Sequence, residues 1–377
     1  MQPGIHTNPT ANRLLSYDLA TQDEKFARAF AILDSGVQQK AFPGAAVAVA
    51  HHGKLVGLKG LGHFTYDANS RAVGPRTIYD LASLTKVVAT TAVCMRLYDR
   101  KQFHLEKRVL DVVPEFAGSD PRRSQVTLRM LLAHSSGLPA YVKLFETAKN
   151  QDELRAKAFQ IPLVADPGAH AEYSDIGFIL LGVALERITS EPLDTLCDRE
   201  IFRPLDLSLG FHPEKTLEAS IPPTENDMRF RRRVIQGEVN DENAWVMGGV
   251  AGHAGCFGAA ESVATLAQCL LNGGAPLFQT HTVELFTRRE NFPAGTSRAL
   301  GWDTPSPPSQ SGKYFSPKSY GHLGYTGTSL WIDPEQQLSV TLLTNRTWPD
   351  RSSQGIKEVR PAFHDAVVQA LDEGSGI

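Results

Sequence analysis

The sequence predicts an α/β protein of the α+β type, with an antiparallel sheet flanked by terminal helices and an inserted, mainly helical domain. Three observations predict this fold class. Paired strand-like runs occur near both ends of the chain, a helical pattern lies beside each pair, and the long middle section repeats apolar residues at helical spacing. The 377 residues are 42% hydrophobic and 21% charged, which is enough to build a large core.

The N-terminal part predicts a helix followed by a β-hairpin. Over residues 22–39 apolar side chains return at helical spacing, as in Phe26, Phe30 and Leu33. Two runs rich in Val, Ala and Leu, 44–50 and 55–61, then flank the turn-like tetrapeptide His-His-Gly-Lys.

The C-terminal part predicts a second hairpin and a closing helix. Residues 329–332 and 338–343 are strand-like and flank a turn that contains Pro334. A helix is expected over about 362–371. Because both ends offer strands and a helix, the economical arrangement is one antiparallel sheet covered by the two terminal helices.

The middle of the chain predicts an inserted helical domain. We therefore expect a sheet domain from residues 1–80 with 295–377, a helical domain from 81–294, and an active site in the cleft between them. Loops are expected at the proline pair 222–223 and over 305–312. The helical segments are 87–97, 128–132, 176–188, 193–201 and 263–271.

Charge and composition exclude several classes of protein. The formal net charge of −3 makes nucleic acid an unfavourable partner, and the short arginine run at 229–233 is expected to be a solvated face. The four cysteines lack metal-ligand spacing and predict buried, free thiols. No membrane span, metal site or cofactor is predicted. The absence of a leader-like start predicts a cytoplasmic protein, or a periplasmic or secreted one if the chain is a processed form. The oligomeric state stays open.

The segment around Ser83 carries the most chemical information. A serine before an apolar helix is most often only a helix N-cap. Lys86, however, lies three positions later and returns to the same helix face, so its amine can reach the Ser83 hydroxyl. A hydroxyl needs a base to become a nucleophile, and a desolvated lysine can provide one. A chain of this length is expected to contain a Ser-x-x-Lys match by chance, so the tetrapeptide alone favours the cap.

Three further segments favour the interpretation of Ser83 as a nucleophile over that of a helix cap. Residues 128–139 end a helix at His134, which we expect to be a C-cap with a turn. Residues 167–177 lead into a helix and contain Tyr173, a potential base, and Asp175, which is either a helix N-cap or a charged group in the site. Residues 322–329 place small residues at the start of a strand, where a substrate can lie close to the backbone.

With these motifs the chain resembles the serine β-lactamase and penicillin-binding protein superfamily, most closely its class C-like branch of peptidases, lactamases and esterases. Ser83-x-x-Lys86 matches the first motif, and Tyr173-Ser174-Asp175 stands where that branch has Tyr-x-Asn. His322-Leu323-Gly324 stands where lactamases have Lys-Thr-Gly. His253-Ala254-Gly255 also fits His-x-Gly, but we expect it to lead into a helix rather than a strand, so we prefer the later match.

The resemblance implies the fold of β-lactamases and transpeptidases and a role for each matched residue. Ser83 would be the acylated nucleophile, Lys86 its proton partner, and Tyr173 the general base for attack and the acid for the leaving group. The oxyanion hole would consist of the backbone N–H groups of Ser83 and Tyr325. Substrate-binding residues would be Asp175, His322 and Gly324.

Two departures from the family pattern bear on the substrate. Asp175 replaces an amide by a carboxylate, which cannot donate a hydrogen bond when ionised and could hold Lys86 cationic. His322 replaces a permanent cation by a group that is mostly neutral near pH 7. Substrates held through a carboxylate, such as penicillins and peptide C-termini, should then bind about 10- to 150-fold less tightly.

We therefore predict a serine hydrolase that acts on ester or amide carbonyls of a small molecule or short peptide through a Ser83 acyl-enzyme. Esterase or D-peptidase activity is expected ahead of lactamase activity. One alternative is a true class C-like β-lactamase, and another is a catalytically silent penicillin-binding or sensory protein on the same scaffold. A third, a metal-dependent hydrolase built on dispersed histidines, would be sensitive to chelators.

Overall fold

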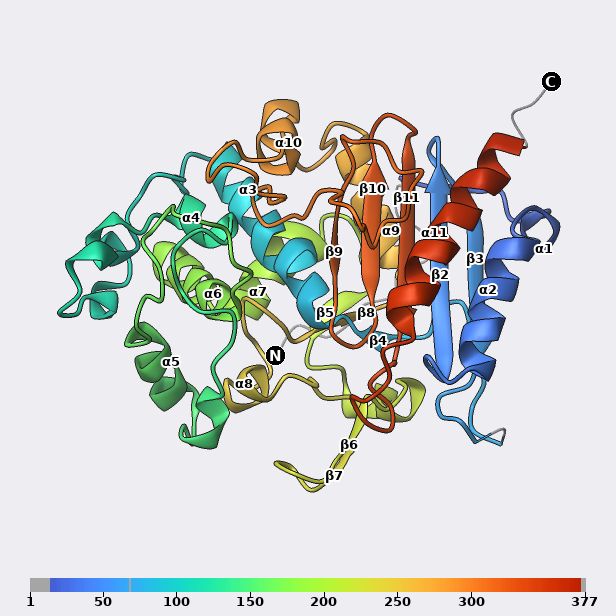
Figure 1. Ribbon diagram of the computed structural model, residues 1–377, viewed down its shortest axis with the longest axis horizontal. Coiled ribbons are helices and arrows are strands. Elements are labelled where there is room, and N and C mark those ends of the chain that lie inside the picture. Colours follow the sequence, from blue (N-terminus) through green and yellow to red (C-terminus); the bar gives the residue numbers. More distant parts are fainter. Residues whose placement is uncertain (1–13, 68, 374–377) are drawn as a thin grey trace.

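The computed structural model describes residues 14–67 and 69–373, and its largest sheet is built from both ends of the chain. The strand order is β1-β3-β2-β11-β10-β9. Strand β2 pairs antiparallel with β11, so N-terminal and C-terminal strands lie side by side (Figure 1). Only β1 pairs parallel to its neighbour. The bounds are Ser16–Tyr17 (β1), Gly44–His51 (β2), Lys54–Gly62 (β3), Tyr320–Leu323 (β9), Ser329–Asp333 (β10) and Leu338–Thr344 (β11).

Two smaller sheets lie beside the large one. Strands β4 (Tyr79–Asp80), β8 (Cys256–Gly258) and β5 (Leu209–Phe211) form one of them, in that order. Strands β6 (Glu225–Asp227) and β7 (Arg233–Ile235) form a separate two-stranded hairpin. Strand β4 ends at Asp80, three residues before Ser83, so this small sheet sets the position of the serine in the fold.

Helices cover both faces of the large sheet. Helices α2 (Ala27–Gln38) and α11 (Ile356–Glu373) pack against each other on one face, and α9 (Ala260–Leu271) packs on the other. Side chains of β2 alternate between the two layers, as the two-residue period of a strand requires. Val47 and Val49 point toward α2 and α11, whereas Ala46, Ala48 and Ala50 point toward α9.

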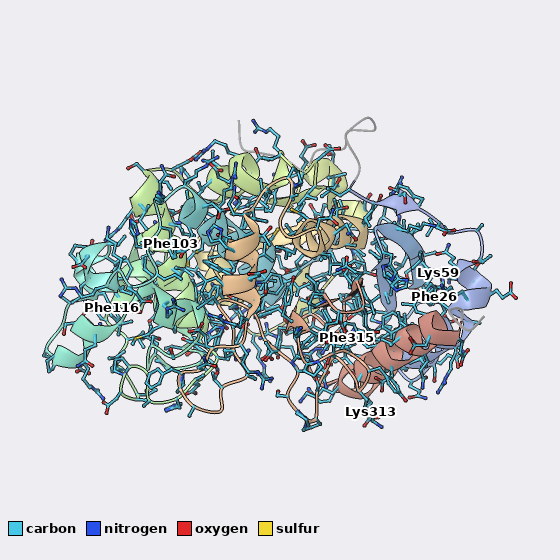
Figure 2. The ribbon with its side chains drawn as sticks, turned by 90° about the horizontal axis from the view of Figure 1, so that it is seen from above. Phe26, Lys59, Phe103, Phe116, Lys313 and Phe315 are labelled. Atoms are coloured by element: carbon cyan, nitrogen blue, oxygen red, sulfur yellow. The ribbon has the colours of Figure 1, made fainter. Side chains whose placement is uncertain are left out.

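The apolar interior consists mainly of two large clusters. The smaller one lies between the sheet and helices α2 and α11 and contains Phe26 and Phe315. The larger one extends from the opposite face of the sheet through the helical region and contains Phe103 and Phe116. Figure 2 shows the two pairs of phenylalanines toward opposite ends of the molecule.

Helices and short helical turns are the main regular elements between β3 and β9. Helix α6 is almost entirely buried, because ten of its residues face the core. The 3₁₀ turn Ala82–Leu84 and the π-helix Lys86–Thr91 precede α3 and carry two of the candidate residues. The remaining α-helices are α1 (Gln22–Lys25), α3 (Ala92–Asp99), α4 (Leu128–Leu132), α5 (Gln151–Phe159), α6 (Asp175–Thr189), α7 (Leu193–Cys197), α8 (Glu242–Val246) and α10 (Thr280–Thr287).

The predicted fold class is confirmed, as are both hairpins and the helical middle section. The first helix differs in detail, because a break at Phe26 separates α1 from α2. The predicted helix at 193–201 continues beyond Cys197 as a π-helix. The division into residues 1–80 with 295–377 and 81–294 stays a prediction.

The closing helix begins earlier than predicted, because it continues through a proline. Helix α11 starts at Ile356 and includes Pro361. A proline lacks the N–H that would bond to the carbonyl four residues before it. That carbonyl, of Lys357, instead accepts a hydrogen bond from Gln310 Nε2 at 3.2 Å.

The prediction of a solvated arginine run is wrong for one of its members. The Arg231 side chain is buried and pairs with Asp227 at 2.9 Å. It also donates to the carbonyls of Val239 and Asn240, which closes the turn after β7. The four cysteines are buried and free, as predicted. Among the described residues, no helix is long and apolar enough to cross a membrane.

Candidate active site

Ser83 lies in a constrained turn at the end of β4. The preceding residue, Ala82, has a φ of 47°, a left-handed conformation that costs roughly 1–2 kcal/mol for an L-residue. Asp80 holds this turn, because its Oδ1 accepts the N–H of Ala82 at 2.8 Å and its Oδ2 accepts the N–H of Asn240 at 2.7 Å. Burial raises the pKa of Asp80 to about 6. The turn leaves Ser83 half-buried at the wall of a cavity.

The interpretation of Ser83 as a helix N-cap is wrong. Ser83 lies inside the 3₁₀ turn, and its hydroxyl contacts two side chains. Lys86 Nζ donates to Ser83 Oγ at 3.0 Å, and Tyr173 OH donates to the same atom at 2.7 Å. The structure therefore brings together the three side chains that the sequence proposed as reactive, although Tyr173 is ninety positions from Ser83.

Lys86 is completely buried and makes three hydrogen bonds. Besides Ser83 Oγ, its Nζ contacts Asp175 Oδ1 at 2.7 Å and the carbonyl oxygen of His253 at 3.0 Å. Burial lowers the pKa of Lys86 below its usual value, and the Asp175 carboxylate opposes that effect. Burial and the Asp175 carboxylate therefore act in opposite directions on the charge of Lys86.

Tyr173 is oriented by the residues around it. The backbone N–H of Ser174 donates to His134 Nδ1 at 3.0 Å, and the His134 ring lies 4.8 Å from the Tyr173 ring. The Arg298 guanidinium lies 5.7 Å from the centre of the same ring. Burial raises the pKa of Tyr173 well above its usual value, so the phenol is the resting form.

The start of α6 differs from the simplest sequence interpretation. Ser174 rather than Asp175 is the N-cap, because its Oγ accepts the N–H of Gly177 at 3.0 Å. Asp175 is the first residue of the helix and is therefore free to pair with Lys86. The expected C-cap and turn follow α4, with Ala133 as the C-cap residue. His134 comes next in a left-handed conformation with φ of 55°, and it also positions the Tyr173 segment.

The third predicted motif lies at the edge of the large sheet, on β9 and the turn that follows it. His322 is buried, and burial lowers its pKa to about 3, so it is neutral near pH 7. Gly324 packs so closely that a Cβ there would lie 1.9 Å from Thr328 Oγ1 and 2.8 Å from the Leu81 carbonyl oxygen. The next residue, Tyr325, is half exposed and lines the cavity.

A cavity of about 1250 Å³ opens beside Ser83. Ser83, Tyr173, Asp175 and Tyr325 are among its lining residues, whereas His322 and Gly324 are not. Much of the remaining wall is provided by residues 225–230 and 240–242. None of residues 290–319 is among the lining residues, although the Arg298 guanidinium lies 5.7 Å from the centre of the Tyr173 ring.

Arg351 joins two parts of the cavity wall. Its guanidinium pairs with Glu225 at 2.8 Å and with Glu242 at 2.7 Å. It also lies 5.6 Å from the centre of the Tyr325 ring. The loop after β11 is thereby tied to the β6–β7 hairpin and to the start of α8.

The sequence analysis did not name Asp241 or Arg298 as site residues. It also preferred His322 over His253 as the histidine of the His-x-Gly motif. His253-Ala254-Gly255 leads into strand β8, which corrects the expectation of a helix there. The His-x-Gly match and the density of glycines over 248–255 were the available signals. No local pattern marks Arg298 or Asp241.

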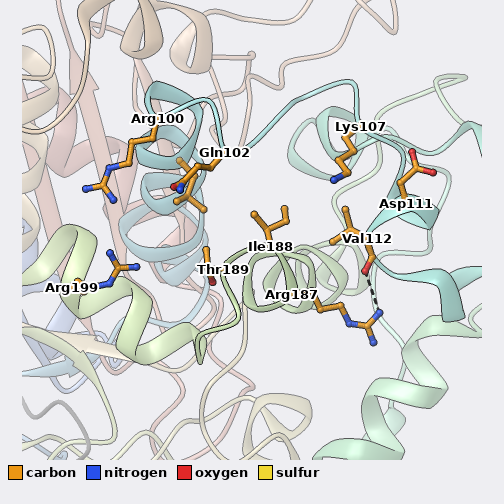
Figure 3. A pocket seen from close by; sticks show the side chains of 10 residues that line it. Arg100, Gln102, Lys107, Asp111, Val112, Arg187, Ile188, Thr189 and Arg199 are labelled. Atoms are coloured by element: carbon orange, nitrogen blue, oxygen red, sulfur yellow. Dashed lines mark hydrogen bonds between the residues drawn. The ribbon is translucent and has the colours of Figure 1, made fainter.

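A second cavity, of about 610 Å³, lies in the helical region away from Ser83 (Figure 3). Four cationic side chains line it, among them Arg100, Arg187 and Arg199. Each of these three arginines is paired with a glutamate, namely Glu200, Glu115 and Glu191 respectively. No serine, cysteine or histidine is among its lining residues, and the hydroxyl of Thr189 donates to the Leu185 carbonyl oxygen at 2.8 Å. Within the part of the chain that the structure describes, no group of His, Cys, Asp or Glu side chains is suited to a metal ion.

The sequence is similar to a large family of known proteins. The family model described as Beta-lactamase matches residues 29–360. A protein of Escherichia coli (strain K12) named "Putative D-alanyl-D-alanine carboxypeptidase" is 34% identical over 304 residues, which cover 72% of this chain and 69% of that protein. The N-acetylmuramyl-L-alanine amidase of Bacillus subtilis (strain 168) is 33% identical over 345 residues, which cover 81% of this chain and 77% of the amidase.

Solved structures share the fold at lower sequence identity. EstCE1, a hydrolase with promiscuous acyltransferase activity, superimposes with a TM-score of 0.72 at 18% identity, covering 92% of this chain and 100% of EstCE1. The octameric penicillin-binding protein homologue from Pyrococcus abyssi gives a TM-score of 0.73 at 20% identity, covering 92% of this chain and 77% of the homologue. At such identities the likeness concerns the fold alone.

Proposed function

Because the chain belongs to the beta-lactamase family, we propose that it is a serine hydrolase that forms an acyl-enzyme on Ser83 and cleaves amide bonds of muramyl-type peptides. One observation carries the catalytic part of the proposal. The Ser83 hydroxyl lies within hydrogen-bond distance of both Lys86 Nζ, at 3.0 Å, and Tyr173 OH, at 2.7 Å. A nucleophile in contact with a base and an acid is the arrangement that acyl transfer requires.

In acylation, Ser83 Oγ attacks the substrate carbonyl carbon while its proton passes to the Lys86 amine. The resemblance implied Tyr173 as this base, but its phenol already donates to Ser83 Oγ. The carbonyl oxygen becomes an oxyanion, which the backbone N–H groups of Ser83 and Tyr325 would stabilise. The intermediate collapses, the carbon–nitrogen bond breaks, and the Tyr173 phenol donates its proton to the departing nitrogen. The products are a Ser83 ester, a free amine, a Lys86 ammonium and a Tyr173 phenolate.

Deacylation uses the same groups in the reverse sense. Water attacks the ester carbon, and the Tyr173 phenolate accepts the proton that the water loses. When the ester bond breaks, the Lys86 ammonium returns its proton to Ser83 Oγ. Both side chains thereby regain their starting forms, and the acid product leaves.

The environment of each group fits these roles. Burial disfavours charge on both Lys86 and Tyr173, so it lowers the pKa of the amine and raises the pKa of the phenol. The resting site can then hold a free amine that accepts a proton and a phenol that donates one. Once acylation has separated charge, the Arg298 guanidinium near the Tyr173 ring stabilises the phenolate.

Two features favour a muramyl-type amide over a peptide with a free C-terminus. A cavity of about 1250 Å³ is larger than the roughly 300–1,000 Å³ of pockets that enclose a drug-sized ligand. His322, which the sequence resemblance places where lactamases have the lysine of Lys-Thr-Gly, is buried and neutral, so a substrate carboxylate gains no ion pair there. The similarity to the N-acetylmuramyl-L-alanine amidase supports the same class.

The test compares initial rates on the C-terminal carboxamide of N-acetylmuramyl-L-alanine, which has no free carboxylate, a peptide ending in D-alanyl-D-alanine, nitrocefin and a p-nitrophenyl ester. We expect the highest kcat/KM among the first three for the muramyl amide, together with hydrolysis of the ester. Ser83→Ala should abolish every one of these activities. A higher kcat/KM for nitrocefin or for the D-alanyl peptide would reject the proposed substrate class. Ser83→Ala activity equal to that of the wild type would reject the mechanism.

A further inference from the structure

The segment 251–256, here called the strap, lies along the helical turns that carry Ser83 and Lys86. Four hydrogen bonds attach it to them at successive positions. These bonds hold the strap at Gly252, His253 and Cys256. They join Thr90 Oγ1 to the Gly252 oxygen at 2.7 Å, Lys86 Nζ to the His253 oxygen at 3.0 Å, the Cys256 N–H to Thr85 Oγ1 at 3.0 Å, and the Leu81 N–H to the Cys256 oxygen at 2.9 Å.

Glycines allow the strap to pack this closely. A Cβ on Gly252 would lie 2.2 Å from the carbonyl oxygen of Phe178 on helix α6. Gly255 has a φ of +117°, and a Cβ there would lie 2.1 Å from the Gly249 oxygen. The strap is therefore wedged between α6 and the Lys86 helix.

The His253 side chain ties the strap to the wall of the substrate cavity. The imidazole is 1% exposed, and its Nε2–H donates to Asp241 Oδ1 at 2.9 Å. The same Asp241 oxygen accepts the N–H of Ala244 at 2.7 Å and so caps helix α8. Asp241 is also one of the residues that line the cavity. A continuous chain of contacts thus links the cavity wall to Lys86.

The hydrogen bonds of Lys86 explain why that link bears on the reaction. A neutral amine has two N–H groups and one lone pair, whereas an ammonium has three N–H groups. Asp175 Oδ1 and the His253 carbonyl oxygen are obligate acceptors, so they take the two N–H groups of the amine. In this amine form the remaining lone pair faces the third neighbour, Ser83 Oγ, 3.0 Å away, so the serine O–H donates to Lys86, whereas in the ammonium form Lys86 donates to the serine. Lys86 can therefore accept the serine proton without changing partners.

We propose that His253 and Asp241 are positioning residues for the reaction, because together they hold the His253 carbonyl against Lys86 and so direct the amine lone pair at Ser83. The inference rests on the proposed function, since it concerns the base of the acylation step. His253 acts through its own backbone oxygen, and its imidazole serves as the anchor. A lysine without this acceptor could rotate its lone pair away from the serine.

The direction of the expected pH effect follows from the hydrogen bond between Lys86 and the His253 carbonyl, and the other charged or titratable groups around Lys86 are unchanged in the His253 variants. Losing the carbonyl acceptor destabilises the ammonium more than the amine, because hydrogen bonds to charged donors are the stronger ones. The acid limb of the rate profile should then move to lower pH while kcat falls. The groups are Asp175 and Tyr173 at the start of α6, Asp241 before α8, Arg298 from the loop before β9, His322 on β9 and His134 after α4.

The experiment compares His253→Gln with His253→Asn. The glutamine amide nitrogen is the same number of bonds from Cβ as Nε2 of histidine, so it can still donate to Asp241, whereas the asparagine nitrogen is one bond short. On a p-nitrophenyl ester we expect His253→Asn to lower kcat about tenfold or more, with KM nearly unchanged and the acid limb at lower pH. We expect His253→Gln to recover most of kcat and the wild-type profile.

His364→Asn is the matched control, because His364 is completely buried, its Nδ1 contacts the Gln310 carbonyl oxygen at 3.0 Å, and it lies outside the site. It should lower stability without changing the pH profile. Folded His253→Asn with wild-type kcat and profile would overturn the proposal, as would equal losses in the Gln and Asn variants. If His253→Asn does not fold, Asp241→Asn is measured instead. A smaller loss in the same direction supports the proposal, and an unchanged profile overturns it.

The outcome for the wild type separates this inference from the proposed function. A wild-type protein no more active than Ser83→Ala would reject the proposed function. If the wild type is active but the His253 variants keep its kcat and pH profile, only the positioning role is rejected.

Discussion

Replacing Asp175 by asparagine tests the balance of charge around Lys86. The Asp175 carboxylate lies 2.7 Å from Lys86 Nζ and is a cause that raises the pKa of both Lys86 and Tyr173. Asparagine keeps an oxygen acceptor in the same place but removes the negative charge. The substitution therefore isolates the electrostatic part of the contact.

The magnitude follows from the strengths of the two kinds of hydrogen bond. A bond to a charged group contributes about 1.5–3 kcal/mol and a neutral one about 0.5–1.5 kcal/mol, a difference of roughly 1.4 kcal/mol. That difference corresponds to about tenfold weaker proton binding by Lys86. Losing a neighbouring anion also makes Tyr173 easier to deprotonate. Both changes lower a pKa, so the two limbs of the pH profile should move in the same direction.

The assay is the pH dependence of kcat/KM on the muramyl amide, because its departing nitrogen must be protonated, whereas a p-nitrophenolate leaves without a proton. In the proposed mechanism the acid limb reports formation of the Lys86 amine and the alkaline limb reports loss of the Tyr173 phenol. We expect Asp175→Asn to move the acid limb to lower pH by about one pH unit. The alkaline limb should move to lower pH as well. Limbs that stay in place, or that move to higher pH, would refute this account of the site.

Three further predictions concern the acid, the third motif and the core, and a fourth concerns metals. Tyr173→Phe should lower kcat by roughly 10²- to 10⁴-fold in steady-state assays, with an unchanged circular dichroism spectrum, because it removes the proton donor. If Tyr173→Phe keeps most of the activity, a group other than Tyr173 must donate the proton to the leaving group. Gly324→Ala should destabilise the fold by about 1–3 kcal/mol in urea titrations and lower activity, since its Cβ would meet Thr328 and Leu81. Phe26→Ala should lower the free energy of unfolding by about 3–5 kcal/mol because the side chain is completely buried, while kcat of the remaining folded protein should stay at the wild-type value. Dialysis against EDTA should leave kcat unchanged, and loss of activity restored by a divalent metal would support the metal-dependent alternative.

The parts of the fold that the sequence predicted are those governed by local patterns. The alternation in β2 and the helical spacing in α2 and α6 are visible in the residues themselves, because each element buries one or both faces. The continuation of α11 through Pro361 depends on Gln310, which reaches the freed Lys357 carbonyl from a distant loop. Such a contact between distant segments leaves no local signal.

The residues of the candidate site also fall into two groups, those that a local pattern predicts and those that only long-range packing brings together. Ser83 and Lys86 lie three positions apart, so their proximity is a property of one helical turn. The approach of Tyr173 was expected from the resemblance, and its ring is oriented by His134 on another segment. Asp241 and Arg298 reach the site only through long-range packing. Their contributions could be found in the structure but not in the order of the residues.

The most direct measurement is the mass of the protein after reaction with a fluorophosphonate probe, followed by peptide mapping of the adduct. If Ser83 is the activated nucleophile, wild-type protein should gain one probe mass, located on the peptide that contains Ser83. Tyr173→Phe should be labelled more slowly, and Ser83→Ala should gain none. A wild-type protein that stays unlabelled, or an adduct on any other residue, would contradict the assignment of Ser83 as the nucleophile.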